Sequence, residues 1–176
     1  MMLNRIGRRL LALAGLMLLP MAIPPARAAT IKIVAIGAST TAGNKVGIDL
    51  AYPAQLQAML RAKGYDVDIQ NEGVSGATSA SMVGWADSVP SDTRLVLLQI
   101  APSNDGRHGI TAAQTAVYRN TIVQHLKARH IRVVFVNRHV SRHQLALDGK
   151  HPNADGQRTI AARLLPQVVA AIGSRR

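Results

Sequence analysis

Hydrophobic positions along the chain alternate between short apolar runs and segments with helical spacing. Residues 31–36 (IKIVAI) and 95–100 (LVLLQI) are short runs of aliphatic, often β-branched side chains, a pattern typical of buried parallel strands. Residues 131–136 (IRVVFV) predict another strand of this kind. Residues 65–70 (YDVDIQ) alternate apolar with polar side chains, which predicts a strand nearer an edge of the sheet.

Apolar residues at helical spacing predict helices between these strands. They include Leu56, Met59 and Leu60, and further along Tyr118, Ile122 and Leu126. Pro53 suits the first turn of the earlier helix and Gly64 its end, while Thr111 and Gln114 form a capping box before the later one. Residues 78–86 form a weaker helical pattern. A last helix is expected over residues 154–172, with a kink at Pro166.

This alternation of strands and helices predicts one α/β domain, a three-layer α/β/α sandwich around a parallel sheet. Such folds bind ligands beyond the carboxyl ends of their strands. The loops that directly follow the strands are therefore the places to search for functional residues.

The first 28 residues have the pattern of a signal peptide. Three arginines precede an apolar run over residues 10–23 that Pro20 interrupts, and small residues at Ala26 and Ala28 suit a signal peptidase. The run is shorter than the roughly 20 residues of a membrane-spanning helix, so no stable membrane span is expected. We therefore expect residues 29–176 to form the mature domain of a periplasmic or secreted protein; an uncleaved N-terminal anchor is the alternative.

Charge and composition narrow the range of partners. The chain has 176 residues, no cysteine and a net charge of +12, or about +8 without the four arginines of the predicted signal peptide. Disulfides and a lipid-anchored cysteine are thus excluded. The few aromatic residues and the lack of a long basic run argue against nucleic acid as a partner. The basic surface favours solubility or attraction to anionic lipid or glycan of the cell envelope.

The loops after the first three strands carry candidate chemistry. Ser39 stands among small residues in the first loop, where its hydroxyl can be exposed, although a turn or helix-cap serine is equally typical of such a position. Gly73 and Gly76 let the second loop approach a ligand closely and direct an N–H at it. In the third loop, Asn104 could donate to an oxyanion and Asp105 could brace the loop, although Asn-Asp-Gly is also a turn sequence.

The segment Asp148-Gly149-Lys150-His151-Pro152 precedes the last predicted helix. A tight turn brings its first and fourth residues together, so the Asp148 carboxylate can reach the His151 imidazole and fix its tautomer. Pro152 restricts His151 to an extended backbone. A surface turn with a solvated histidine is the alternative interpretation.

Taken together, the stretches IGASTTAG, NEGVSGATS, PSNDG and DGKHPNADGQ resemble the SGNH hydrolase superfamily, also called GDSL esterases/lipases. The similarity is greatest to its bacterial periplasmic arylesterase, acyl-CoA thioesterase and lysophospholipase branch. The resemblance implies a flavodoxin-like fold, with Ser39 as nucleophile, His151 as base and Asp148 as the acid that orients it. It also implies three oxyanion donors: the N–H groups of Ser39 and Gly76 and the side chain of Asn104.

The chain departs from this family at three places. Ala38 replaces the aspartate that normally braces the nucleophile loop, which should loosen Ser39. Pro102 replaces a usual glycine and makes the position of Asn104 less certain. A helix and a strand that usually lie between Asn104 and Asp148 are missing, which predicts a four-stranded sheet and a shallow acyl site favouring short acyl groups.

The basic loop over residues 138–143 occupies that shortened region. It could recognise an anionic head group, or it could simply be solvated. His139 and His143 have spacing compatible with a metal ion, but the sequence offers no evident third ligand, so neither metal nor cofactor is expected.

The predicted function is hydrolysis of a small-molecule ester or thioester through an acyl-enzyme on Ser39, by a protein that is expected to be a monomer. Substrates of the thioesterase or lysophospholipase type, and acetyl groups on polysaccharide, remain open. A catalytically weak domain that binds envelope lipid or glycan is the non-enzymatic alternative. A nucleotide-binding domain has little support, since the chain lacks a P-loop and Gly37 to Gly43 lacks the dinucleotide-binding glycine spacing.

Overall fold

The computed structural model describes residues 29–173. The predicted signal peptide, residues 1–28, lies outside this part of the chain. The sheet of the described domain has four parallel strands in the order β2-β1-β3-β4. The strands are β1 (Ile31–Gly37), β2 (Val67–Gly73), β3 (Thr93–Leu98) and β4 (Arg132–Phe135). The predicted four-stranded parallel sheet is therefore confirmed.

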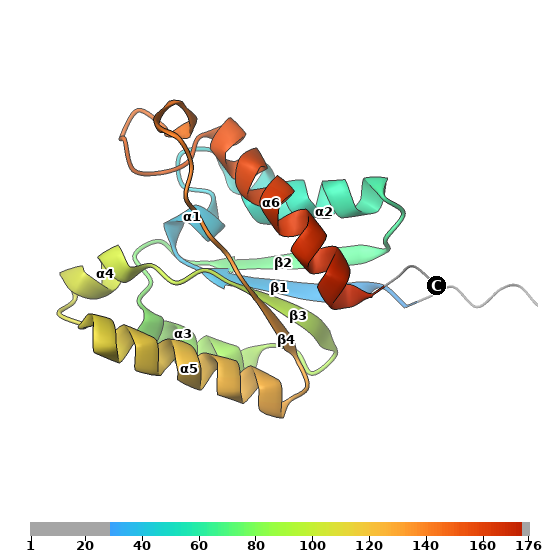
Figure 1. Cartoon of the computed structure of the whole chain (residues 1–176), viewed down its shortest axis with the longest axis horizontal. Coiled ribbons are helices and arrows are strands. Elements are labelled where there is room, and N and C mark those ends of the chain that lie inside the picture. Colours follow the sequence, from blue (N-terminus) through green and yellow to red (C-terminus); the bar gives the residue numbers. More distant parts are fainter. Residues whose placement is uncertain (1–28, 174–176) are drawn as a thin grey trace, which may run out of the picture.

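Helices cover both faces of the sheet, as Figure 1 shows. Side chains of α2 (Tyr52–Ala62) and α6 (Ala154–Ile172) pack on one face, and those of α3 (Ser79–Ser88) and α5 (Ala112–Ala128) on the other. The short helices α1 (Ser39–Ala42) and α4 (Pro102–Arg107) follow β1 and β3, and two 3₁₀ turns, η1 (Ile48–Leu50) and η2 (Arg142–Gln144), complete the elements of the described chain. This is the predicted three-layer α/β/α sandwich.

Side-chain alternation along the central strands divides the core into two layers. Ile33 on β1 belongs to the apolar cluster with α2 and α6, whereas its neighbour Val34 belongs to the cluster with α3 and α5. Successive side chains of a strand point to opposite faces, so a strand covered on both sides must be apolar throughout. This explains why β1 and β3 are near-continuous apolar runs. In β2, by contrast, buried Val67 and Ile69 alternate with exposed neighbours, as expected for an edge strand.

The helix predictions agree with the structure in their main features. The capping box of Thr111 and Gln114 is present, and the weaker pattern at residues 78–86 is a true helix with its own capping box from Thr78 to Ser81. The last helix begins at Ala154 and continues through Pro166. Its N-cap is Asn153, whose side chain accepts a hydrogen bond from the N–H of Gly156.

Several bounds differ from the prediction. β3 covers Thr93–Leu98 instead of residues 95–100, and β4 covers Arg132–Phe135 instead of residues 131–136. The second strand begins at Val67 instead of Tyr65, because the N–H of Tyr65 bonds to the carbonyl of Leu60 and closes the end of α2. The loop expected after the third strand is instead the helix α4, in which Pro102 occupies the first turn. Proline is favoured there because its fixed φ suits the helix and its missing N–H is not needed.

Candidate functional site

The candidate site lies at the carboxyl ends of the strands, where α1, α4 and the long segment between β4 and α6 meet (Figure 1). A cavity of about 680 Å³ opens there. Its lining includes Ser39 at the start of α1, Asn104 on α4 and His151 from the segment before α6. The structure therefore places three of the predicted site residues around one cavity.

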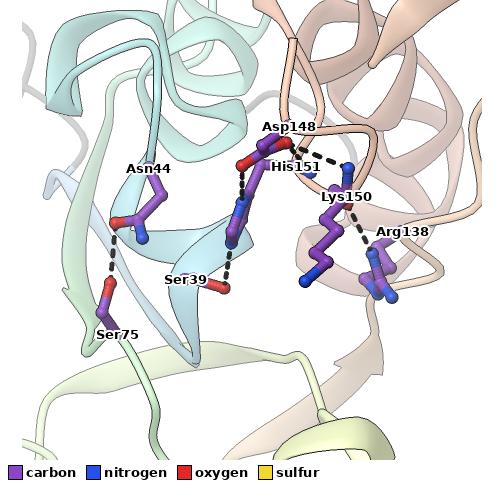
Figure 2. Close-up of polar contacts among 7 residues, drawn as sticks. All are labelled: Ser39, Asn44, Ser75, Arg138, Asp148, Lys150 and His151. Carbon is purple, nitrogen blue, oxygen red and sulfur yellow. Dashed lines mark hydrogen bonds and ion pairs between the residues drawn. The ribbon is translucent and has the colours of Figure 1, made fainter. Parts of the chain in front are cut away.

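Ser39, His151 and Asp148 form a continuous hydrogen-bonded chain, shown in Figure 2. The distance from Ser39 Oγ to His151 Nε2 is 2.9 Å, and that from His151 Nδ1 to Asp148 Oδ2 is 2.6 Å. When Nδ1–H donates to the carboxylate, the lone pair of Nε2 accepts the serine hydroxyl proton. This is the geometry that a serine nucleophile and its base require.

The loop that carries Asp148 and His151 is held by bonds within itself. Asp148 Oδ1 accepts the backbone N–H groups of Lys150, at 2.9 Å, and His151, at 3.0 Å. Gly149 lies between Asp148 and Lys150, with φ of 64°, a left-handed conformation that favours glycine. The backbone N–H of His151, its imidazole and the N–H of Lys150 together hold the pKa of the Asp148 carboxyl well below its usual range. Asp148 is therefore ionised at neutral pH.

The turn that carries Ser39 is held differently, by side-chain amides from distant elements. Gln99, after β3, accepts the N–H of Ala38 at 2.9 Å. Gln157 of α6 donates to the carbonyl of Thr40 at 3.0 Å. Asn71 of β2 donates to the carbonyl of Thr41 at 2.8 Å. Three separate segments thus fix the backbone on both sides of Ser39.

Gly73 lets α1 sit directly against the end of β2. A Cβ at this position would lie 2.2 Å from the backbone nitrogen of Ala42, a distance that real Cβ atoms do not show. Any other residue here would push α1, and Ser39 with it, away from the sheet. We expected the second loop to approach a ligand closely; the close approach at Gly73 is instead to the backbone of α1.

Ala38 is almost fully buried, and its N–H is bonded to Gln99. That Ala38 loosens Ser39 remains a prediction. It did not take into account the hydrogen bond between the N–H of Ala38 and Gln99. The sequence reasoning missed Gln99, Gln157 and Asn71. A polar residue at the end of the apolar run LVLLQI was the signal that could have drawn attention to Gln99.

The three predicted oxyanion donors differ in their position relative to the cavity: Ser39 and Asn104 line it, and Gly76 does not. The N–H of Ser39 belongs to the first turn of α1, where backbone donors lack partners within the helix. Asn104 is buried at the cavity, but its Nδ2 donates to the carbonyl of Ala77 at 2.8 Å, and its Oδ1 accepts from Arg107. One amide hydrogen of Asn104 therefore remains for a ligand. Gly76 has a left-handed φ of 82° on an exposed loop, and it is not among the described residues that line the cavity.

Asp105 braces the neighbouring loops, as predicted. It is fully buried, and its carboxylate accepts the N–H and hydroxyl of Ser79 and the hydroxyl of Thr115, each at 2.7 Å. These bonds join α3, α4 and α5 at the site and replace the water that a buried carboxylate loses. Asn104 is held next to this junction.

The basic loop also lies where it was expected, since Arg138 and His139 line the cavity. Within residues 29–173, no group of three or more metal-ligating side chains is present. Nor does the described chain contain a helix long and apolar enough to cross a membrane.

The chain matches a known protein family. Residues 35–175 match the GDSL-like lipase/acylhydrolase family. A search of curated proteins found no match.

Solved structures share the fold. TesA is 18% identical with a TM-score of 0.72, over 80% of this chain and 99% of TesA. The psychrotrophic esterase EstA from Pseudoalteromonas sp. is 16% identical with a TM-score of 0.68, over 79% of this chain and 97% of EstA. A family 3 carbohydrate esterase from Clostridium thermocellum is 18% identical with a TM-score of 0.64, over 82% of this chain and all of that chain. The matched family spans most of the domain, and the fold agrees with that of SGNH esterases, so the chain belongs to the GDSL-like lipase/acylhydrolase family.

Proposed function

We propose that the protein hydrolyses carboxylic esters or thioesters through an acyl-enzyme on Ser39. The observation that carries this proposal is the hydrogen-bonded chain from Ser39 Oγ through His151 to Asp148. It supplies a nucleophile, a base within reach of its proton, and an ionised acid that orients the base.

In the first half of the reaction, His151 Nε2 takes the proton of Ser39 while Oγ bonds to the carbonyl carbon of the substrate. The negative charge that develops on the carbonyl oxygen is met by the Ser39 N–H and the remaining N–H of Asn104, with Gly76 as the third donor after a small movement of its loop. The tetrahedral intermediate then loses its C–O or C–S bond, and His151 gives its proton to the departing alcohol or thiol.

In the second half, a water molecule replaces the alcohol or thiol. His151 takes a proton from the water, whose oxygen attacks the acyl carbon, and the carboxylic acid leaves as Ser39 regains its proton. Asp148 stays ionised throughout and stabilises the imidazolium form of His151 without taking its proton.

The preferred acyl group is proposed to be short. Among the described residues that line the cavity, the apolar side chains are Ala101, Val140 and Leu145. Each buried CH₂ contributes about 0.8 kcal/mol, so three such side chains give a long acyl chain little to bind. Acetyl groups on polysaccharide are compatible with this cavity. Faster hydrolysis of long-chain than of short-chain esters would contradict the proposal.

The test compares the purified protein with Ser39→Ala on p-nitrophenyl acetate and butyrate. We expect kcat/KM to fall by about 10³ or more in the variant, because the nucleophile is lost. Equal, near-background rates for both proteins would contradict the proposal and favour a domain that binds envelope lipid or glycan.

Export to the periplasm or the medium is a further part of the proposal, which rests on the sequence of residues 1–28. Mass spectrometry of the exported protein should find its N-terminus at Ala29. An intact N-terminus on a membrane-bound protein would instead indicate an anchor.

A further inference from the structure

The cavity at Ser39 is lined by cations. Arg107, Arg138 and Lys150 contribute to its wall, and of the described residues that line it none is aspartate or glutamate. The ion pairs found between described residues involve none of these three side chains. Within the described chain, none of these three side chains is paired with a carboxylate, so each can bind an anionic group of a bound molecule.

Arg107 differs from the other two because its side chain is bonded to the side chain of a predicted oxyanion donor. Its guanidinium donates to Oδ1 of Asn104, on the side of the cavity where the oxyanion donors lie. This contact fixes the orientation of the Asn104 amide and leaves its NH₂ group as the donor.

Arg138 and Lys150 lie on the side of the reacting groups away from Ser75 (Figure 2). In Figure 2 both side chains stand to one side of Ser39 and His151, while Ser75, the neighbour of Gly76, stands on the opposite side. A bond of 3.3 Å from the guanidinium of Arg138 to the carbonyl of Lys150 holds the two segments together. Lys150 also directly precedes His151 in the chain. Both cations are thus tied to the loop that carries the base.

The chemistry of the reaction decides which part of the substrate lies next to Arg138 and Lys150. The carbonyl oxygen must point to the oxyanion donors, and the departing oxygen or sulfur must lie within hydrogen-bond reach of His151 Nε2 to receive its proton. The alcohol or thiol part of the substrate therefore extends toward the His151 side, and the acyl part extends elsewhere.

We infer that the site selects esters or thioesters whose alcohol or thiol part carries an anionic group, which Arg138 and Lys150 bind. This inference rests on the proposed function and adds the chemical class of the leaving group. Phosphate, sulfate and carboxylate all fit, since guanidinium and ammonium groups pair with each of these oxyanions. A negative charge on the acyl part gains nothing from these two cations.

The experiment uses three probe esters. Para-acetoxybenzenesulfonate has an anionic leaving group, and para-acetoxybenzenesulfonamide is its neutral counterpart of nearly the same shape. Monophenyl succinate carries its charge on the acyl part. Measured for each protein, the ratio of kcat/KM for the sulfonate to that for the sulfonamide isolates recognition of the leaving-group charge.

We expect the double variant Arg138→Gln, Lys150→Gln to lower this ratio about tenfold, mainly through KM, because charges near a site raise the local concentration of an oppositely charged substrate. About 1 M NaCl should produce much of the same loss in the wild type, since it shortens the Debye length to about 3 Å. The matched control is Arg94→Gln, an exposed arginine near the amino end of β3, far from the carboxyl-end cavity. It should leave the ratio unchanged.

An unchanged ratio in the double variant, with both acetates still hydrolysed, overturns the inference while the proposed function stands. An equal loss for monophenyl succinate also overturns it, because the cations would then act on any anion. Hydrolysis of all three esters at the Ser39→Ala background instead overturns the proposed function, and the inference with it.

Discussion

The two segments that carry the reacting groups are stabilised in opposite ways. The loop from Asp148 to His151 is partly exposed and holds its shape through the two backbone N–H groups that Asp148 accepts and through Gly149. The turn at Ser39 is packed into the core, and amides from β2, α6 and the end of β3 hold its backbone. One segment is built locally, whereas the other depends on the assembled fold.

This difference explains how each segment should respond to substitution. A locally built loop can lose its function without loss of the fold, because few other elements depend on it. A turn that three elements share cannot be altered without a cost in stability. Loss of Gln99, for example, leaves the buried N–H of Ala38 without its acceptor.

Asp148→Asn should lower kcat by about 10³–10⁴ while the protein keeps its fold. An asparagine in this place no longer holds His151 in the tautomer that accepts the serine proton, and it cannot stabilise the imidazolium. Kinetics on p-nitrophenyl acetate measure the effect. Asp155→Asn, the same change at an exposed position in the first turn of α6, is the control. Activity within tenfold of the wild type would show that Asp148 does not orient the base.

Asn104→Ala should lower kcat by about 10²–10³, which is typical for loss of one oxyanion donor. The side chain lines the same cavity as Ser39 and His151 and is bonded to Ala77 and Arg107. Because the interaction strengthens in the transition state, kcat should fall more than KM rises. Asn120→Ala, at an exposed position on α5, serves as the control. A change confined to KM would mean that Asn104 binds the substrate without stabilising the oxyanion.

Gln99→Leu should lower both stability and activity. Leucine fills a similar volume but leaves the buried N–H of Ala38 without its acceptor, at a cost of about 1–3 kcal/mol. We expect kcat to fall about tenfold as Ser39 loses its position. Urea unfolding measures the change in stability, and ester hydrolysis measures the change in kcat. The control is Gln167→Leu, the same substitution at an exposed position. Full activity and unchanged stability would show that Gln99 does not brace the turn.

The stability that Asp148 contributes should depend on pH only in strong acid. Its pKa in the folded protein lies below the ordinary value of 3.8, so the folded state binds this proton less readily than the unfolded chain. The contribution is thus fully present above pH 3.8 and decreases as the pH falls toward the folded pKa. The difference in melting temperature between the wild type and Asp148→Asn should stay constant from neutral pH to about pH 5 and decrease below pH 4. A difference that already disappears near pH 6 would contradict the lowered pKa.

Contacts within a short segment could be predicted from the sequence, whereas contacts between distant segments could not. The contact of Asp148 with His151 followed from a spacing of three residues, because a tight turn joins its own ends. The strands followed from apolar runs, since a parallel sheet covered on both faces needs them. The Gln99 brace joins residues 61 positions apart in the chain, and no local pattern specifies such a contact.

Errors also occurred where local patterns were ambiguous. The sequence Pro-Ser-Asn-Asp-Gly is typical of a turn, yet Pro102 here begins a helix in which Asn104 and Asp105 are buried. Packing against α3 through the Ser79 bonds outweighs the turn propensity of these residues. The contact of Arg107 with Asn104 depends on that helix, so it could not be predicted from a loop.

Covalent labelling with an alkyl fluorophosphonate tests most directly whether Ser39 is a nucleophile activated by His151. The reagent reacts with an activated serine, and peptide mass spectrometry identifies the modified residue. We predict one adduct per molecule, at Ser39, with labelling reduced by about 10³ or more in His151→Ala and absent in Ser39→Ala. Labelling at another serine, or labelling of Ser39 at the same rate without His151, would contradict this account of the site.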